Sequence, residues 1–159
     1  MTSFKNIVLH WTAGNYTPCI TDLQRYHYII DKTGKLYKGT HKPEDNLNCK
    51  DGNYAAHTGG GNTGRIGIAI ACMKDKNTPP TQKQVEAMCK LSAQLCIAYG
   101  LQPKDCITHA EFGLKNPKTT SYGKIDINSL PYVDKKGIAP VGEYLRNKIS
   151  WYLTKIKGI

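Results

Sequence analysis

Two histidines and one aspartate in this chain are of the types that bind a metal ion. His10 and His109 each close a short apolar run, and Asp126 follows two residues after Lys124. Two imidazoles and one carboxylate provide three protein ligands, which a catalytic zinc site uses while its fourth position stays open for water. An ammonium at Lys124 would lie near the charge that develops on a polarised carbonyl. The combination predicts a metal-assisted hydrolase.

The hydropathy pattern indicates which elements would position these residues. Continuous apolar runs predict buried strands, and apolar residues spaced by three and four predict amphipathic helices. Thr81 with Gln84 forms a capping box, and Gly100 supplies a stop for the helix between them. Residues 41–64 are predicted to be mostly loop, and 110–130 to be irregular. The pattern predicts strands at 6–11, 65–73 and 105–109, a hairpin of 26–31 with 35–38, and helices at 18–25, 82–99 and 141–155.

Strands interleaved with helices favour an α/β fold, and the hairpin makes the central β-sheet mixed, with α-helices on its flanks. The 159 residues are 40% hydrophobic, which suits one domain over 1–159. The longest nearly apolar run, 66–73, is far shorter than a membrane span needs, and 1–6 lack the pattern of a secretory leader. We therefore expect a monomer that is made in a cytosol and has no membrane span.

Charge and cysteine content bound the function further. The formal net charge of +10 implies an anionic partner, such as nucleic acid or a phosphate-rich envelope. No basic run or recognised nucleic-acid motif is present, so no specific nucleic acid is expected as a partner. The six cysteines form no C-x-x-C pair, and reduced, buried thiols are the expectation, with a disulfide left open after export.

In the order and spacing of its motifs the chain resembles the type 2 N-acetylmuramoyl-L-alanine amidases, zinc enzymes that include phage lysozyme-type endolysins and peptidoglycan-recognition proteins. The resemblance covers nearly the whole chain. Its motifs are His10-Trp11-Thr12-Ala13, Tyr26-His27-Tyr28-Ile29-Ile30-Asp31, Ala56-His57-Thr58-Gly59, Ile66-Gly67-Ile68, Thr108-His109 and Lys124-Ile125-Asp126.

The resemblance implies a role for each matching residue. His10, His109 and Asp126 correspond to the zinc ligands, and Zn²⁺ is the implied cofactor. Lys124 matches the family's catalytic lysine, and Tyr26 matches the tyrosine of its phage lysozyme-type branch. Both are expected at the developing oxyanion, although Tyr26 could instead be a sheet aromatic and 124–126 a solvated loop.

Other positions of the motif set carry weaker expectations. Many members have a glutamate after Ile-Gly-Ile that can act as general base, whereas this chain has Ala69 there. Proton transfer would then use Tyr26, the zinc-activated water or another group. His57, Thr12 and Asn62 are predicted to contact substrate, with an ordinary flexible Gly-rich loop as the alternative for the segment that begins at His57.

The resemblance implies a zinc-dependent peptidoglycan hydrolase that cleaves the amide between N-acetylmuramic acid and L-alanine. A phage or prophage endolysin would wait in the host bacterial cytoplasm before release and would then act in the periplasm and cell wall. The alternative is a non-catalytic peptidoglycan-recognition module on the same fold. Such modules typically lose a zinc ligand, whereas all three ligand positions are filled here. A basic nucleic-acid binder ranks last, because only the charge favours it.

Overall fold

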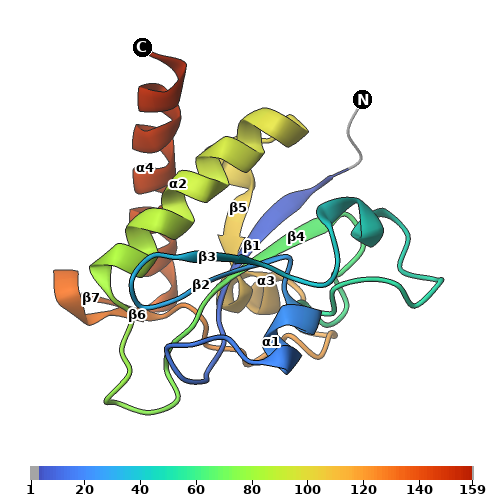
Figure 1. Ribbon diagram of the computed structural model, residues 1–159, viewed down its shortest axis with the longest axis horizontal. Helices are drawn as coiled ribbons and strands as arrows, with labels where there is room; N and C mark the ends of the chain where they lie inside the picture. Colours follow the sequence, from blue (N-terminus) through green and yellow to red (C-terminus); the bar gives the residue numbers. More distant parts are fainter. Residues whose placement is uncertain (1–3, 159) are drawn as a thin grey trace.

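The computed structural model describes residues 4–158 of the chain. A five-stranded sheet in the order β3-β2-β4-β1-β5 forms its centre, and helices flank the sheet (Figure 1). The strands β2, β4, β1 and β5 run parallel, and β3 pairs antiparallel with β2. The predicted α/β fold with a mixed sheet is therefore confirmed. The strands of this sheet are β1 (Asn6–Trp11), β2 (Tyr28–Ile30), β3 (Leu36–Lys38), β4 (Arg65–Ile70) and β5 (Cys106–Thr108).

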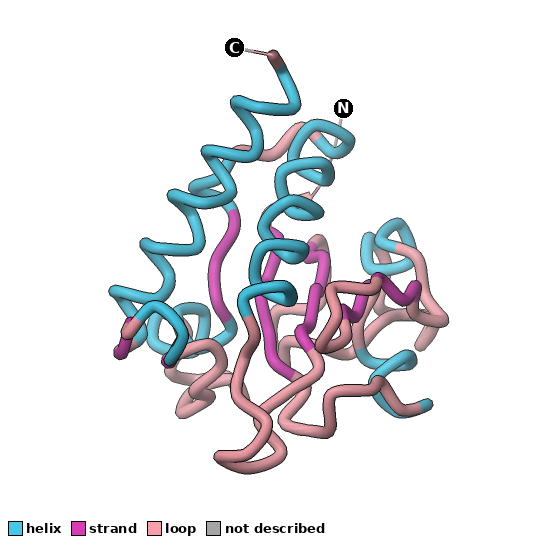
Figure 2. The backbone as a smooth tube through the Cα atoms, turned by 60° about the vertical axis from the view of Figure 1, so that its left-hand side comes forward, coloured by secondary structure: helices cyan, strands magenta, loops and turns pink. Residues whose placement is uncertain are grey.

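Two long helices lie side by side against one face of the sheet (Figures 1 and 2). The Thr81 hydroxyl accepts a hydrogen bond from the backbone N–H of Gln84 (3.2 Å), and Gly100 ends the helix with φ 69°, as predicted. These helices are α2 (Gln82–Tyr99) and α4 (Ile138–Lys157). No helix in residues 4–158 combines the length and the apolar character that a membrane crossing requires.

The remaining elements are short. They are the helices α1 (Ile20–Arg25) and α3 (His109–Lys115), the 3-10 turns η1 (Pro43–Leu47), η2 (Pro103–Asp105) and η3 (Pro131–Val133), and the two-stranded sheet of β6 (Ser129–Leu130) and β7 (Lys135–Lys136).

Side-chain alternation along β1 decides where chemistry can occur. Ile7, Leu9 and Trp11 pack into the main hydrophobic cluster with the apolar faces of α2 and α4. Successive residues of a strand point to opposite faces, so His10 points away from those helices. It pairs in register with Ala69 of β4, and both residues are fully buried. The fold thus separates a packed apolar face from a polar face that carries the histidine.

Several details of the sequence prediction were wrong. The first helix begins at Ile20 rather than at 18, because the carboxylate of Asp22 accepts a hydrogen bond from the backbone N–H of Cys19 and caps the helix there. The stretch 110–130 is not wholly irregular, since α3 occupies its start. The last helix was predicted over 141–155 but spans Ile138–Lys157, and its last turns project beyond the sheet (Figure 1).

Candidate metal centre

The ends of two neighbouring strands bring His10 and His109 together. Strands β1 and β5 are parallel, and Leu9 pairs in register with Thr108. His10 follows Leu9 within β1, while His109 is the first residue of α3. The hydroxyl of Thr108 accepts a hydrogen bond from the backbone N–H of Glu111 (3.1 Å), which caps this helix directly before His109. Sheet register and a helix cap therefore fix both histidine backbones.

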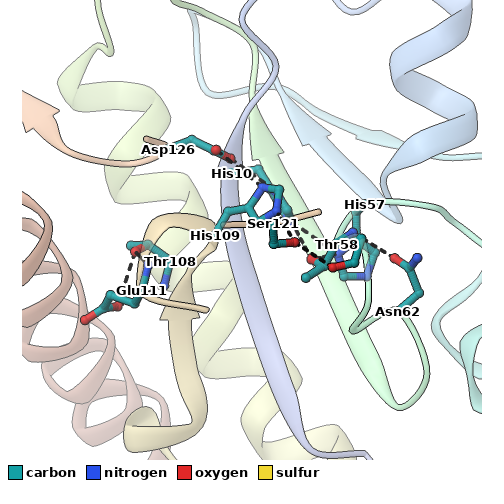
Figure 3. Close-up of polar contacts among 10 residues, drawn as sticks. His10, His57, Thr58, Asn62, Thr108, His109, Glu111, Ser121 and Asp126 are labelled. Atoms are coloured by element: carbon teal, nitrogen blue, oxygen red, sulfur yellow. Dashed lines mark hydrogen bonds and ion pairs between the residues drawn. The ribbon is translucent and has the colours of Figure 1, made fainter. Parts of the chain in front are cut away.

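Asp126 completes the cluster from a loop. Its backbone carbonyl accepts a hydrogen bond from the N–H of Ala110 (2.6 Å), which anchors the loop to the first turn of α3. Its carboxylate lies between the two rings, with Oδ2 at 3.1 Å from Nδ1 of His10 and Oδ1 at 3.3 Å from Nδ1 of His109 (Figure 3). One ligand atom from each residue lies within 4.8 Å of the other two, and all three residues are buried.

The protonation states favour a cation at this point. Burial lowers the pKa of His10 to about 4, although the Asp126 carboxylate opposes the shift. Burial alone would raise the pKa of Asp126, but the two histidines, whose Nδ1 atoms lie against the carboxylate, outweigh it and hold that pKa below its usual range. At neutral pH the centre therefore pairs a neutral His10 with an ionised carboxylate.

The donor set and its spacing fit zinc. Tetrahedral zinc with ligand bonds of about 2.0–2.1 Å spaces its ligand atoms about 3.3 Å apart. Oδ2 and Oδ1 of Asp126 lie 3.1 and 3.3 Å from the Nδ1 atoms of His10 and His109, and one ligand atom from each residue lies within 4.8 Å of the others, so one ion could contact all three residues. Calcium and magnesium prefer six or more oxygen ligands, which this set of two nitrogens and one carboxylate does not offer. These three protein ligands would leave a tetrahedral zinc one position for water or substrate.

A cavity of about 670 Å³ opens beside this cluster and contains several of the residues predicted from sequence. Tyr26, Lys124 and Thr12 line it together with His57, His109 and Asp126. The ring of Tyr26 lies 5.1 Å from that of His10, centroid to centroid. Burial raises the pKa of the Tyr26 phenol, so it stays protonated and can donate a hydrogen bond.

The residues predicted to contact substrate lie in different places. Thr12 faces the cavity, although its hydroxyl already accepts a hydrogen bond from the N–H of Gly14. Asn62 does not line this cavity, because its Oδ1 accepts a hydrogen bond from the N–H of Thr58 (2.7 Å) and braces the loop from within. The structure thus shows Asn62 bracing the loop, and its contact with substrate stays a prediction.

His57 lies behind His10 and is only 5% exposed. Its Nδ1 is 3.1 Å from Nε2 of His10, and its own Nε2 is 3.1 Å from the carbonyl of Arg65. Burial lowers the pKa of His57 well below its usual value, so the ring is neutral. Its main contacts are thus with the protein itself, although one edge reaches the cavity wall.

The position after Ile-Gly-Ile carries no acid. Ala69 lies beside His10 in the sheet and is fully buried. Asp126 is the one carboxylate among the described residues that line the cavity. A separate carboxylate base is therefore absent from this part of the described chain, as the sequence indicated.

Sequence reasoning missed two groups of residues around the centre. Ser121 lies 2.9 Å from Nε2 of His109 and donates to the carbonyl of Gly59 (2.8 Å), and no sequence signal marks it. Glu111 forms an ion pair with Arg146 of α4. Glu111 could have been predicted from the sequence as a helix-capping residue, because Thr108-x-x-Glu111 has the spacing of a capping box.

Residues 1–124 match the sequence model of a family described as N-acetylmuramoyl-L-alanine amidase. This chain belongs to that family. A search of curated proteins found no match to set beside it. Among solved structures, the chain is similar to the amidase AmiA of Staphylococcus aureus in complex with its ligand, with TM-score 0.68 and 16% identity over 98% of this chain and 75% of that one.

Two further structures show the range of this amidase fold. AmpDh3 of Pseudomonas aeruginosa, in complex with an anhydromuramic pentapeptide, matches with TM-score 0.59 and 17% identity over 92% of this chain and 60% of that one. The Drosophila peptidoglycan recognition protein SD matches with TM-score 0.53 and 21% identity over 76% of each. At these identities the similarity establishes the fold alone.

Proposed function

We propose that this member of the amidase family is a zinc-dependent peptidoglycan hydrolase that cleaves the amide between N-acetylmuramic acid and L-alanine. The observation that carries the proposal is the convergence of His10, His109 and Asp126, of which His109 and Asp126 line a cavity of about 670 Å³. Zinc bound there would polarise the scissile carbonyl and lower the pKa of a water at its open position.

The chain's own residues supply the rest of the chemistry. The protonated phenol of Tyr26 donates a hydrogen bond to the carbonyl oxygen or orients the attacking water. The ammonium of Lys124, on the cavity wall, stabilises negative charge on that oxygen. With Ala69 in place of an acid, the proton of the attacking water would pass to the departing amine of L-alanine, either directly or by a relay in which Tyr26 gives its phenol proton to the amine as it takes the proton of the water.

The test is digestion of purified sacculi followed by mass spectrometry of the soluble fragments. The proposal expects peptides with a free L-alanine amine and intact glycan strands. The variant Asp126→Asn, which removes a zinc ligand and preserves side-chain shape, is expected to release none. Cleavage within the glycan or between peptide residues would contradict the proposal.

The second candidate function is that of a non-catalytic peptidoglycan-recognition module. Similarity to the Drosophila recognition protein favours it to the extent that the same fold serves recognition there. Zinc analysis and pull-down on sacculi separate the two. Bound zinc with cleavage supports the hydrolase, whereas binding to sacculi with neither zinc nor cleavage supports recognition.

We further propose a biological setting, that of a phage or prophage endolysin acting as a monomeric domain. Such an enzyme would reside in the host cytoplasm until release and then reach the periplasm and cell wall. The net charge of +10 supports contact with an anionic envelope. Light scattering tests the monomer, and lysis of cells only after the membrane is permeabilised tests the location.

A further inference from the structure

The Nε2 atoms of His10 and His109, which point away from Asp126, lie within hydrogen-bond distance of His57 and Ser121. Each histidine directs Nδ1 to Asp126 and Nε2 away from it (Figure 3). A neutral imidazole carries its proton on one nitrogen and a lone pair on the other. Whatever holds the proton at Nε2 therefore decides whether Nδ1 can bind a metal ion.

For His109, the residue that fixes the proton at Nε2 is Ser121, which is fully buried. The Ser121 hydroxyl lies 2.8 Å from the carbonyl of Gly59 and 2.9 Å from Nε2 of His109. A carbonyl can only accept, so the hydroxyl proton points to Gly59. The hydroxyl oxygen must then accept from Nε2–H of His109, which leaves the lone pair on Nδ1.

For His10, the residue that fixes the proton at Nε2 is His57. Nε2 of His57 faces the carbonyl of Arg65 at 3.1 Å and so carries the proton of this neutral ring. Its Nδ1 is therefore an acceptor, and Nε2 of His10, at 3.1 Å, must donate to it. The hydroxyl of Thr58, 2.7 Å from Nδ1 of His57 and 3.5 Å from Nε2 of His10, can relay the same hydrogen bond in the same direction.

Both chains of hydrogen bonds end on carbonyls of one segment, His57–Arg65. The segment is held in place by Asn46, whose backbone carbonyl accepts from the N–H of Gly64 (2.8 Å) and whose side-chain amide donates to the carbonyl of Asn62 (3.1 Å). Gly67 leaves room for the His57 ring, because a Cβ there would lie 2.5 Å from Cγ of His57. The segment is thus built to present the two carbonyls in fixed places.

We propose that His57 and Ser121 are positioning residues that fix both ligand histidines as the Nε2–H tautomer, so that the segment His57–Arg65 sets the affinity of the metal centre. The inference rests on the zinc site of the proposed function. It reassigns His57 from a predicted substrate contact to support of a ligand. Partners of this kind typically change metal affinity by about 10–100-fold when they are removed.

The first test compares two serine variants by competition for Zn²⁺ against a chromogenic chelator. Ser121→Ala is expected to raise the zinc dissociation constant by about 10–100-fold. The matched control is Ser92→Ala, because Ser92 is also buried and donates to a backbone carbonyl, that of Met88 (2.8 Å), within α2. The control is expected to leave zinc affinity unchanged, and urea unfolding of the metal-free proteins checks that all variants fold.

The second test separates the two nitrogens of His57. An asparagine amide oxygen can take the place of Nδ1 and still accept from His10, whereas a glutamine amide reaches only the place of Nε2. His57→Gln is therefore expected to weaken zinc binding by about 10–100-fold, and His57→Asn to retain more of the affinity. Nitrogen-15 NMR of the ring nitrogens in the zinc-loaded protein should show the Nε2–H tautomer for His10 and His109.

Several outcomes would overturn the inference: wild-type affinity in both Ser121→Ala and His57→Gln, an equal loss in Ser92→Ala, or an Nδ1–H tautomer at either ligand. Failure of the proposed function would look different. A protein that binds Zn²⁺ with these variant effects but leaves sacculi intact would refute the hydrolase and support the positioning roles. A wild-type protein that binds no Zn²⁺ would overturn both.

Discussion

The ion pair between Arg146 and Glu111 gives a prediction whose magnitude follows from its geometry. The two guanidinium nitrogens Nη1 and Nη2 lie 2.8 and 2.9 Å from the two carboxylate oxygens, and Nη1 also donates to the carbonyl of Cys106 (3.2 Å). The carboxylate accepts in addition from the N–H of Thr108 (2.9 Å). The pair thus ties α4 to the end of β5, directly before the ligand His109.

Arg146→Met keeps most of the side-chain volume but leaves the carboxylate of Glu111 without its partner. Breaking a fully buried pair costs about 3–5 kcal/mol. The side chains here are 26% and 16% exposed, so solvent screens part of that cost and about 2 kcal/mol is expected. For a chain of this size that corresponds to a fall in Tm of about 4–8 °C.

The cost should depend on pH in a definite direction. Burial alone would raise the pKa of Glu111, but the hydrogen bonds and charge of Arg146 and the N–H of Thr108 outweigh it and hold the folded pKa below the ordinary value of 4.5. A depressed carboxyl pKa stabilises the fold above the unfolded pKa, and this contribution is lost as pH falls through the folded value. The difference in the free energy of unfolding between wild type and Arg146→Met should be largest at pH 7 and should decrease below about pH 4.

Urea unfolding followed by circular dichroism at pH 7 and pH 3 measures both effects. Lys148→Met is the control on the same helix, because Lys148 pairs with Glu86 at 3.2 Å but is 34% exposed. Its loss should cost less than about 1 kcal/mol. Equal costs for the two variants, or a cost of Arg146→Met that is the same at both pH values, would refute the reasoning.

Three further predictions concern the metal centre and the fold around it. When the free zinc concentration is 100 times the dissociation constant, removing the zinc with a chelator should lower the free energy of unfolding by about 2.7 kcal/mol. The variant Asp126→Asn should show no such chelator effect in thermal unfolding. Lys124→Met should keep its zinc by metal analysis but lower kcat on sacculi by about 10²–10³-fold, so an unchanged rate would remove Lys124 from the mechanism. Thr81→Ala should destabilise the protein by about 1 kcal/mol in urea without altering zinc affinity, and a loss of affinity would tie α2 to the centre.

The central sheet was predictable because its strands are nearly pure apolar runs. Residues 7–11 and 66–70 are buried on both faces, and strands buried in this way are recognisable as continuous apolar runs. The capping box at Thr81 and the stop at Gly100 were equally local signals. The meeting of His10 with His109 required more, because it depends on β1 and β5 being neighbours, which only the structure shows.

What the sequence did not reveal depends on contacts between distant segments. Ser121 and Arg146 have no local pattern around them, since their partners Gly59 and Glu111 are brought near only by the complete fold. Asn62 looked like a cleft residue because it follows three glycines, but its amide is used inside the loop. Short-range patterns predict elements well, whereas side-chain partners across elements require coordinates.

The central place of β1 has a consequence for synthesis. Strand β1 lies between β4 and β5, so a nascent chain must complete both of these later strands before β1 is paired on each side. His10 and Asp126 are separated by 116 positions, which makes their encounter one of the most non-local events in the fold. The candidate metal site can therefore exist only after residue 126 has been synthesised, and a polypeptide interrupted before that residue would carry only part of it.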